Sequence, residues 1–428
     1  MSNMRINIHL LFFMTYSHYL HHFFLYSFPS LVILIIEDIP LNYAEIGLLA
    51  SLPIVIMAIT SPLIGHLSKK HSNGFIIVVI GLIFFSISAW YFSISQNIFD
   101  LVISNFLLGL GATTFHPIGL GVVANSFPSE NRGKALSVNH AAGVLGNATS
   151  PIFCLFLSLF VLDSWRTTFI FIGLVYIAST VALILWILLK KLIIEYKIIF
   201  DSLARTTIET EIVDQKAEKR LSLGKNWFFI TLTVILIISA LRNGVYRCTS
   251  FFTVTLLKDF YNLESFDAGL WSSAILFVGA FFDLYGAQLS DKTGPFGRIK
   301  LTIFSAITSS IAIITLIIIT DSFNSFWLVI LSFGLFAVFF YISGGTLQAL
   351  MSDVVPKDQR TFFYSLVFSM GLVVSSISPS IFGWLLDFMQ GPNLALFFLV
   401  ILMVISLFFS LIFQQRLKKV VESGLLEE

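Results

Sequence analysis

Long apolar segments alternate with short polar or charged breaks along nearly the whole chain. A transmembrane helix needs about 20 predominantly apolar residues, and breaks at proline, glycine and charged clusters separate twelve segments of that kind. The pattern predicts an all-α integral membrane protein with twelve transmembrane helices in two pseudo-symmetric six-helix bundles. We expect helices near residues 8–36, 44–67, 74–95, 98–125, 134–160, 166–189, 227–257, 265–290, 299–320, 323–351, 361–386 and 393–415.

The largest gap between apolar segments falls in the middle of the chain. The stretch from Lys190 to Lys225 contains eight Lys or Arg residues and six Asp or Glu residues, a composition typical of a solvated loop. We therefore expect an N-terminal six-helix bundle at 1–190, a cytoplasmic linker at 191–226, and a C-terminal six-helix bundle with a short cytoplasmic tail at 227–428.

The two halves carry related sequence patterns. Identical residues recur 222 positions apart in the early part of each half and 228 positions apart in the later part, and a six-residue insertion around Gly294–Arg298 accounts for the change. The recurring pairs are Gly47 and Gly269, Ser51 and Ser273, Lys70 and Lys292, Pro128 and Pro356, Arg132 and Arg360, Gly143 and Gly371, and Pro151 and Pro379. The chain is therefore interpreted as a duplicated six-helix unit, an arrangement that places a substrate cavity between the repeats near the bilayer midplane.

Composition excludes most other classes of protein. Hydrophobic residues make up 57% of the chain and charged residues 11%, whereas soluble domains carry about 25% charged residues. The formal net charge of +1 argues against a nucleic-acid partner, which requires a basic surface. Two cysteines, Cys154 and Cys248, provide neither a disulfide framework nor a four-cysteine metal site. The spans leave little room for a separate soluble catalytic domain.

The positive charges predict an orientation in the membrane. Of 25 Lys and Arg residues, nearly all fall on the side of the membrane that also holds both termini and the central loop. Arg166 and Lys258 fall on the opposite side, and Arg242 and Arg247 lie inside the seventh segment. Since positive loops stay in the cytoplasm, we expect a multi-pass protein of the cytoplasmic (inner) membrane of a prokaryote, with both termini in the cytoplasm.

Two loops resemble the signature of the major facilitator superfamily of secondary transporters. The stretch from Gly65 to Gly74 follows its G-x-L-x-D-R-x-G-R-R pattern but has Lys69 at the acidic position, whereas the stretch from Leu289 to Gly294 keeps the acid at Asp291. In relatives this acidic residue contacts a neighbouring helix and helps hold the outward-facing state. The resemblance implies a gating role for the loop residues Lys69, Lys70, Arg132, Asp291, Lys292 and Arg360.

Within that superfamily, two stretches are similar to the fosmidomycin-resistance group of efflux proteins. The first is Ser17-His18-Tyr19-Leu20-His21-His22, which has His22 where that group tends to have an acid. The second joins Phe115-His116-Pro117 to Arg132-Gly133-Lys134 and to the helix from Gly143 to Pro151. The resemblance implies efflux of a small organic compound. It assigns the helix from Gly143 to Pro151, which includes Gly146, to helix packing, and the internal repeat extends this role to Gly371 and Pro379.

Three histidines lie close together in the first apolar segment. His18 and His22 are four residues apart and so share a helix face, with His21 beside them and Tyr26 one turn further. Imidazole titrates near pH 6.5, so the cluster is a candidate for proton coupling or substrate contact. The alternative is a set of neutral histidines whose hydrogen bonds are satisfied by nearby helices.

Ionisable residues within a span are costly unless they face a cavity or a partner. Arg242 and Arg247, with Tyr246 between them, interrupt the seventh segment and suit an anionic substrate. Residues five apart on a helix point in different directions, so Arg242 is the preferred site residue and Arg247 is expected to reach towards the outer interface. Asp283, in the eighth segment, is a candidate proton acceptor or the partner of one of these arginines.

The fourth and fifth segments add further polar residues among glycines and prolines. The candidates for lining the transport path are Asn105, His116, Asn139 and His140, with Gln348 in the tenth segment as a weaker one. Small residues also allow close helix approach, and ordinary tight packing is the alternative explanation.

The expected function is secondary active transport of a small organic solute by alternating access, with an anion as one candidate class of solute. Proton-coupled efflux is preferred, and proton- or ion-coupled uptake of a metabolite is the alternative. A membrane di-iron enzyme is a remote alternative, because His18-x-x-His21-His22 has no second histidine box. A transporter-like sensor without transport is a third alternative, which would keep its signalling when flux is lost. Since no G-x-x-x-x-G-K-[ST] loop is present, ATP drive is not expected. We expect no enzyme activity, no cofactor and no metal, and a functional monomer with a solute, protons and lipid as partners.

Overall fold

The computed structural model describes residues 2–70, 74–127, 129–192, 225–322, 325–347, 349–350 and 360–422, and within these ranges it is helical with no β-strand. Its helices are α1 (Ser2–Asp38), α2 (Tyr43–Lys70), α3 (Gly74–Ile94), α4 (Ile98–Thr113), α5 (Phe115–Ser126), α6 (Ser129–Phe156), the π-helix η1 (Leu157–Val161), α7 (Trp165–Leu192), α10 (Lys225–Asp259), α11 (Ser265–Ser322), α12 (Phe326–Tyr341), α14 (Arg360–Met389) and α15 (Asn393–Glu422).

The helices follow the twelve predicted apolar segments. Among the described residues, ten spans are long and apolar enough to cross a membrane, and α4 and α12 are shorter apolar helices. The predicted fourth segment is divided into α4 and α5 at Thr114, where Pro117 lies in the first turn of α5, a position that tolerates the missing N–H. The prediction of an all-α, twelve-span membrane protein is confirmed.

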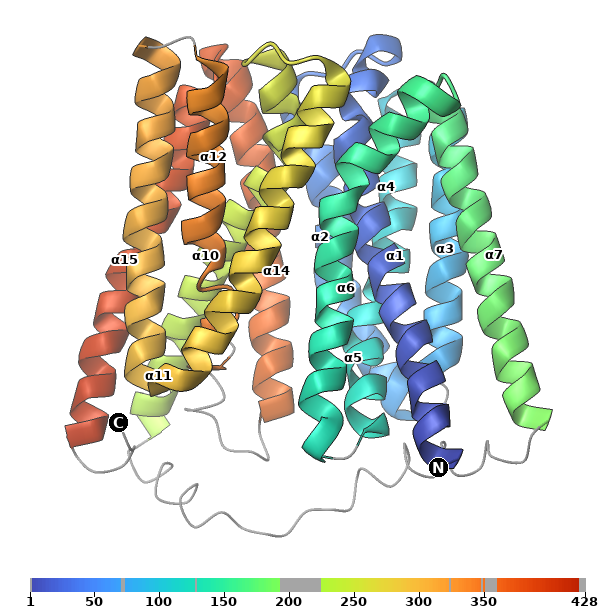
Figure 1. Ribbon diagram of the computed structural model, residues 1–428, viewed down its shortest axis with the longest axis horizontal. Coiled ribbons are helices and arrows are strands. Elements are labelled where there is room, and N and C mark those ends of the chain that lie inside the picture. Colours follow the sequence, from blue (N-terminus) through green and yellow to red (C-terminus); the bar gives the residue numbers. More distant parts are fainter. Residues whose placement is uncertain are drawn as a thin grey trace. The chain divides into compact units, whose positions relative to one another are not determined.

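The predicted eighth and ninth segments form the two arms of α11 (Figure 1). They meet at Gly294, whose φ of 60° and ψ of −175° are not helical. A positive φ is available to glycine at little cost, and Pro295 disfavours a helical residue before it. This Gly-Pro pair therefore ends one arm and begins the next. It coincides with the point where the sequence repeats change their spacing.

Residue contacts divide the chain into two units. Unit 1 comprises Met1–Leu41, Leu49–Glu209 and Glu264–Ser273, and unit 2 comprises Asn42–Leu48, Thr210–Leu263 and Ala274–Glu428. Within unit 1, α1 packs along α6, and α3 packs against α4 and α7 (Figure 1). The domain boundaries at 190 and 227 stay a prediction, because most of the proposed linker lies outside the described residues.

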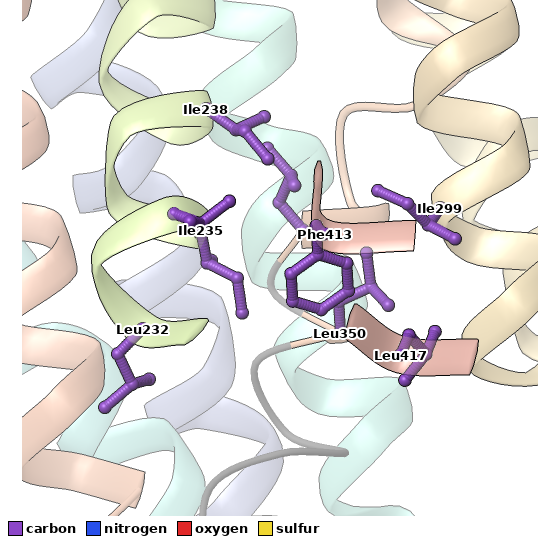
Figure 2. Packing of buried hydrophobic residues seen from close by; sticks show 9 residues of the cluster. Leu232, Ile235, Ile238, Ile299, Leu350, Phe413 and Leu417 are labelled. Atoms are coloured by element: carbon purple, nitrogen blue, oxygen red, sulfur yellow. The ribbon is translucent and has the colours of Figure 1, made fainter. Parts of the chain in front are cut away.

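In unit 2, α10 packs against α14 and α15. Figure 2 shows the apolar cluster that fills one part of this unit, with Ile235 and Ile238 of α10 on one side of Phe413 and Ile299 of α11 on the other. Phe413 is only 1% exposed. Between membrane-spanning helices, close van der Waals packing of this kind drives association, so the cluster holds α10, α11 and α15 together.

The contact between α1 and α6 depends on glycine. A Cβ atom at Gly146 would overlap the backbone oxygen of Tyr19 and lie 2.9 Å from the backbone nitrogen of Phe23. Neither backbone atom can move without shifting α1. The glycine that the sequence singled out for helix packing is therefore in direct contact with the backbone of the neighbouring helix.

We predict that Gly146→Ala destabilises the protein by about 1–3 kcal/mol, the usual cost of overpacking. The measurement is the midpoint of thermal unfolding of the detergent-purified protein. Gly334→Ala in α12 is the matched control, because a Cβ there has no atom within 4 Å and alanine favours the helix by up to about 1 kcal/mol. Equal unfolding midpoints for the two variants would contradict the close contact.

Candidate functional site

The three histidines of α1 are joined by a fourth from α5. The ring centroid of His116 lies 5.4 Å from that of His18, 4.7 Å from that of His21 and 5.3 Å from that of His22. His18 and His21 are buried, and His22 and His116 are partly exposed. The structure therefore brings together residues that the sequence placed in two separate segments.

Two of these imidazoles have defined hydrogen bonds to α6. Nδ1 of His18 lies 2.7 Å from the backbone oxygen of Asn139, and Nδ1 of His22 lies 2.9 Å from Oδ1 of Asn147. Both oxygens accept hydrogen bonds, so each Nδ1 carries a proton. In a neutral ring the lone pair is then on Nε2. For His18, this Nε2 is buried and has no hydrogen-bond partner among the described residues.

Aromatic and glycine residues surround the histidine cluster. The ring of Phe115 stacks on that of His18, with centroids 4.7 Å apart and planes 15° apart. A Cβ atom at Gly143 would lie 2.8 Å from Nε2 of His18 and 2.9 Å from Cδ2 of His22. Gly143, assigned to helix packing from the sequence, thus also leaves room beside two imidazoles.

A second candidate site surrounds Arg242 in unit 2. The Arg242 side chain is 6% exposed, and its Nη2 donates to the backbone oxygen of Phe340 at 2.7 Å and to Oγ of Ser343 at 2.6 Å. Nη2 also lies 3.0 Å from Oγ of Ser305, and the guanidinium carbon lies 4.8 Å from the ring centroid of Phe340.

Among the residues that the structure describes, the contacts of Arg242 include no negatively charged group. Nη1 is buried and has no hydrogen-bond partner within the described ranges, and no described residue forms a salt bridge with this guanidinium. A buried charge without a compensating partner is expensive. The arrangement is suited to receive an anion at Nη1.

Asp283 of α11 reaches the same turn that holds Arg242. A Cβ atom at Gly344 would overlap Oδ1 of Asp283, and Gly344 follows Ser343, which contacts Nη2 of Arg242. The structure describes no salt bridge between Asp283 and Arg242. The two charged groups therefore meet the turn after α12 from two different helices.

Arg247 and Tyr246, the other two candidates on α10, lie against aromatic rings. Arg247 is also buried, with its guanidinium carbon 5.5 Å from the ring centroid of Tyr246 and 5.8 Å from that of Phe251. Tyr246 is half-buried and its ring centroid lies 5.9 Å from that of Tyr341.

The remaining candidates differ in their environments. Tyr26, Asn105 and Asn139 are buried, and His140 is exposed. Nδ2 of Asn105 donates to the backbone oxygen of Leu101 at 2.9 Å, a bond within its own helix. Tyr26 is likewise part of the packed interior of unit 1. Of the packing residues, Pro151, Gly371 and Pro379 are buried within their helices.

Several predicted gating residues lie where the side chains are not described. Lys292 is exposed on α11. Gln348 lies outside the described residues, and the side chains of the other predicted gating residues are also outside them, namely Lys69, Lys70, Arg132, Asp291 and Arg360. Their roles stay predictions.

Sequence reasoning missed a polar cluster in unit 2. The carboxylate of Asp387 accepts from the backbone nitrogen of Tyr43 at 3.0 Å and from that of Ala44 at 2.7 Å, at the first turn of α2. The hydroxyl of Tyr43 also donates to Oδ2 of Asp259 at 3.1 Å. A carboxylate at a helix N-terminus is favourable, but this one lies on a helix far along the chain, so no local pattern reveals it.

Most of the chain matches the model of a known protein family. Residues 11–379 match the model of the Major Facilitator Superfamily. The nitrite extrusion protein of Bacillus subtilis is 23% identical to this chain over 66% of the chain. The riboflavin transporter RibZ of Clostridioides difficile is 26% identical over 53% of the chain. These matches cover 64% and 48% of the two relatives. The quinolone resistance protein NorA of Staphylococcus aureus is 24% identical, over 82% of this chain and 83% of NorA.

Solved structures share the fold. A bacterial homologue of the human lysosomal transporter Spinster matches with a TM-score of 0.74 at 15% identity, over 95% of this chain and 97% of that chain. The xylose transporter XylE from E. coli matches with a TM-score of 0.70 at 14% identity, over 94% of this chain and 98% of that chain. At these identities the likeness concerns the arrangement of helices alone.

Proposed function

Because the chain belongs to the major facilitator superfamily, and is therefore a multi-pass secondary transporter of small molecules and not an enzyme, we propose that it exports a small organic anion in exchange for protons by alternating access. The observation that carries the proposal is the buried Arg242, whose Nη1 has no partner among the described residues. A carboxylate, phosphonate or similar group would complete its coordination.

The chemistry of guanidinium favours an anion with two oxygens. Arginine presents a planar fork of donors that matches carboxylate and phosphate groups, and charge-assisted bonds of this type are roughly twice as strong as neutral ones. Nη2 is already held by Phe340 and Ser343, so the orientation of the guanidinium is fixed before the solute arrives. This preorganisation supports Arg242 as the residue that recognises the solute.

Export is the direction we propose. Two of the relatives are named for extrusion and for quinolone resistance, and the sequence resembles the fosmidomycin-resistance group, a resemblance that stays a prediction. Uptake of a metabolite is the second candidate, since RibZ is named a riboflavin transporter. The positive charges of the loops support an orientation with both termini in the cytoplasm, and we expect a monomer in the inner membrane.

Proton coupling is proposed to act through Asp283. Its carboxylate lies against Gly344, next to the Ser343 that holds Arg242, so a change of charge on Asp283 acts on the turn that positions the guanidinium. Arg247, Tyr246 and Tyr341 are further charged or titratable groups that the structure describes in this region. The sequence prediction that the histidines carry the proton stays a prediction.

A panel of ligands tests the class of solute. We expect fosmidomycin or a quinolone carboxylate to raise the thermal unfolding temperature of the purified protein, because a ligand that binds only the folded state stabilises it by about 2.7 kcal/mol at 100 times its dissociation constant. Riboflavin is the member of the panel that represents the uptake alternative. A response to neutral compounds alone, with none to any anion, would remove the proposed class.

A further inference from the structure

Three histidines from two helices of unit 1 form a compact group, which we call the histidine triad: His18 and His22 of α1 and His116 of α5. One ring nitrogen from each lies within 4.8 Å of the other two. A tetrahedral zinc ion with Zn–N bonds of about 2.0–2.1 Å holds its nitrogen ligands about 3.4 Å apart, so side-chain shifts of about 1 Å bring the triad to that spacing. The three imidazoles are therefore close to the geometry of a metal site.

The hydrogen bonds on the other side of the rings fit the same chemistry. Metal-binding histidines usually donate their second ring N–H to an oxygen, which fixes the tautomer and the orientation of the ring. Nδ1 of His18 has such a bond to the backbone of Asn139, and Nδ1 of His22 has one to the side chain of Asn147. In both rings the lone pair is left on Nε2, the atom that binds a metal.

The Nε2 atom of His18 provides an independent observation. It belongs to a side chain that is 3% exposed, and it has no hydrogen-bond partner in the described part of the chain. An acceptor left unsatisfied in the interior costs about 1–3 kcal/mol. A Cβ atom at Gly143 would lie 2.8 Å from it, so the glycine keeps this edge of the ring free of a side-chain clash. A bound cation would satisfy it.

The ligand set indicates the class of ion. The triad offers nitrogen ligands alone, which suit zinc, copper, nickel and cobalt, whereas magnesium and calcium require oxygen ligands. Three protein ligands leave one position of a tetrahedral ion open, and the partial exposure of His22 and His116 gives the ion a route to the site. His21 packs beside the triad, with its ring centroid 4.9 Å from that of His22.

We propose that the histidine triad binds a divalent transition-metal ion of the zinc class through three imidazole nitrogens, with one coordination position open. The site lies in unit 1 and does not depend on the identity of the transported solute or on Arg242. It departs from the sequence expectation of no metal site. That expectation considered the histidines of the first segment without the one that α5 adds to them.

Titration of the whole protein with Zn²⁺ tests the site. The protein is purified with an affinity tag that lacks histidine, stripped with a chelator, and titrated calorimetrically. We expect one ion per chain. Asn147→Leu removes the amide oxygen that accepts from Nδ1 of His22, and we expect it to weaken binding roughly 10- to 100-fold. We expect His18→Gln, His22→Gln and His116→Gln to weaken binding by more than this. His9→Gln is the matched control, since His9 is exposed on the same helix α1, and it should leave binding unchanged.

Spectroscopy with Co²⁺ keeps the test decisive if a glutamine variant fails to fold. We expect the intense visible absorption of a four-coordinate ion in the wild type, and a thiolate charge-transfer band in His116→Cys, because cysteine replaces imidazole as a ligand. Binding that survives each of the three triad substitutions would overturn the proposal. The weak absorption of a six-coordinate ion in the wild type, or no binding at all, would overturn it as well.

Discussion

Replacing Arg242 with alanine is expected to abolish transport of an anionic solute while the protein still inserts into the membrane. Removing one partner of a buried, hydrogen-bonded charge pair costs about 2–5 kcal/mol, which corresponds to a loss of roughly 30- to 4,000-fold in binding. The readout is counterflow of the anionic ligand that gives the largest thermal shift, measured in proteoliposomes. Counterflow needs no ion gradient, so it isolates recognition of the solute from coupling.

Two further variants separate recognition from stability. Arg242→Lys keeps the charge but loses the planar fork, so we expect an intermediate rate. Asn243→Ala is the matched control on α10, because Asn243 is exposed and its side chain bonds to Ser239 of its own helix, and it should transport normally. Wild-type counterflow in Arg242→Ala, with correct insertion, would remove Arg242 from the solute site.

The second large effect is expected for Asp283→Asn, which removes the proposed proton carrier and preserves the size of the side chain. With the membrane potential clamped at zero, exchange of one proton per anion across a pH difference of one unit supports about tenfold accumulation, since a factor of ten corresponds to about 1.4 kcal/mol. We expect the variant to show no accumulation under this gradient. Its counterflow should continue, because that exchange requires no net movement of protons.

The control for this variant is Asp267→Asn. Asp267 is exposed in the first turn of the same helix, α11, so the substitution changes the same charge at a position away from the turn at Gly344. It should accumulate the anion as the wild type does. Tenfold accumulation by Asp283→Asn would show that the proton is carried elsewhere, with the histidines as the first residues to examine.

The helices could be predicted from the sequence because the requirement for apolar residues extends over each whole membrane-spanning segment. Lipid exposure imposes the same requirement on some 20 consecutive residues, so the position of each helix follows from hydropathy. The break at Gly294-Pro295 was also visible as a change in repeat spacing. The division between α4 and α5 was not, because Thr114 keeps helical backbone angles and the predicted segment is apolar on both sides of it.

The candidate sites were predictable only in part. The intramembrane position of Arg242 marked it as functional, since a charge in a span is costly. Its partners Ser305 and Ser343 gave no signal, because serine is common in helices and its contact depends on how α10, α11 and the end of α12 pack. The same limit applies to His116, whose place beside His18 depends on α5 lying against α1. Tertiary packing decides which helices contact one another, and a local sequence pattern does not reveal these contacts.

The most direct test of the central claim is accumulation of the anionic ligand by wild-type proteoliposomes with an acidic interior, no nucleotide and the membrane potential clamped at zero. The account predicts about tenfold accumulation for a pH difference of one unit, abolished by a protonophore and absent in Arg242→Ala. Accumulation that ignores the pH difference and follows sodium or ATP instead, or that persists unchanged in Arg242→Ala, would contradict proton-coupled transport of an anion through this site.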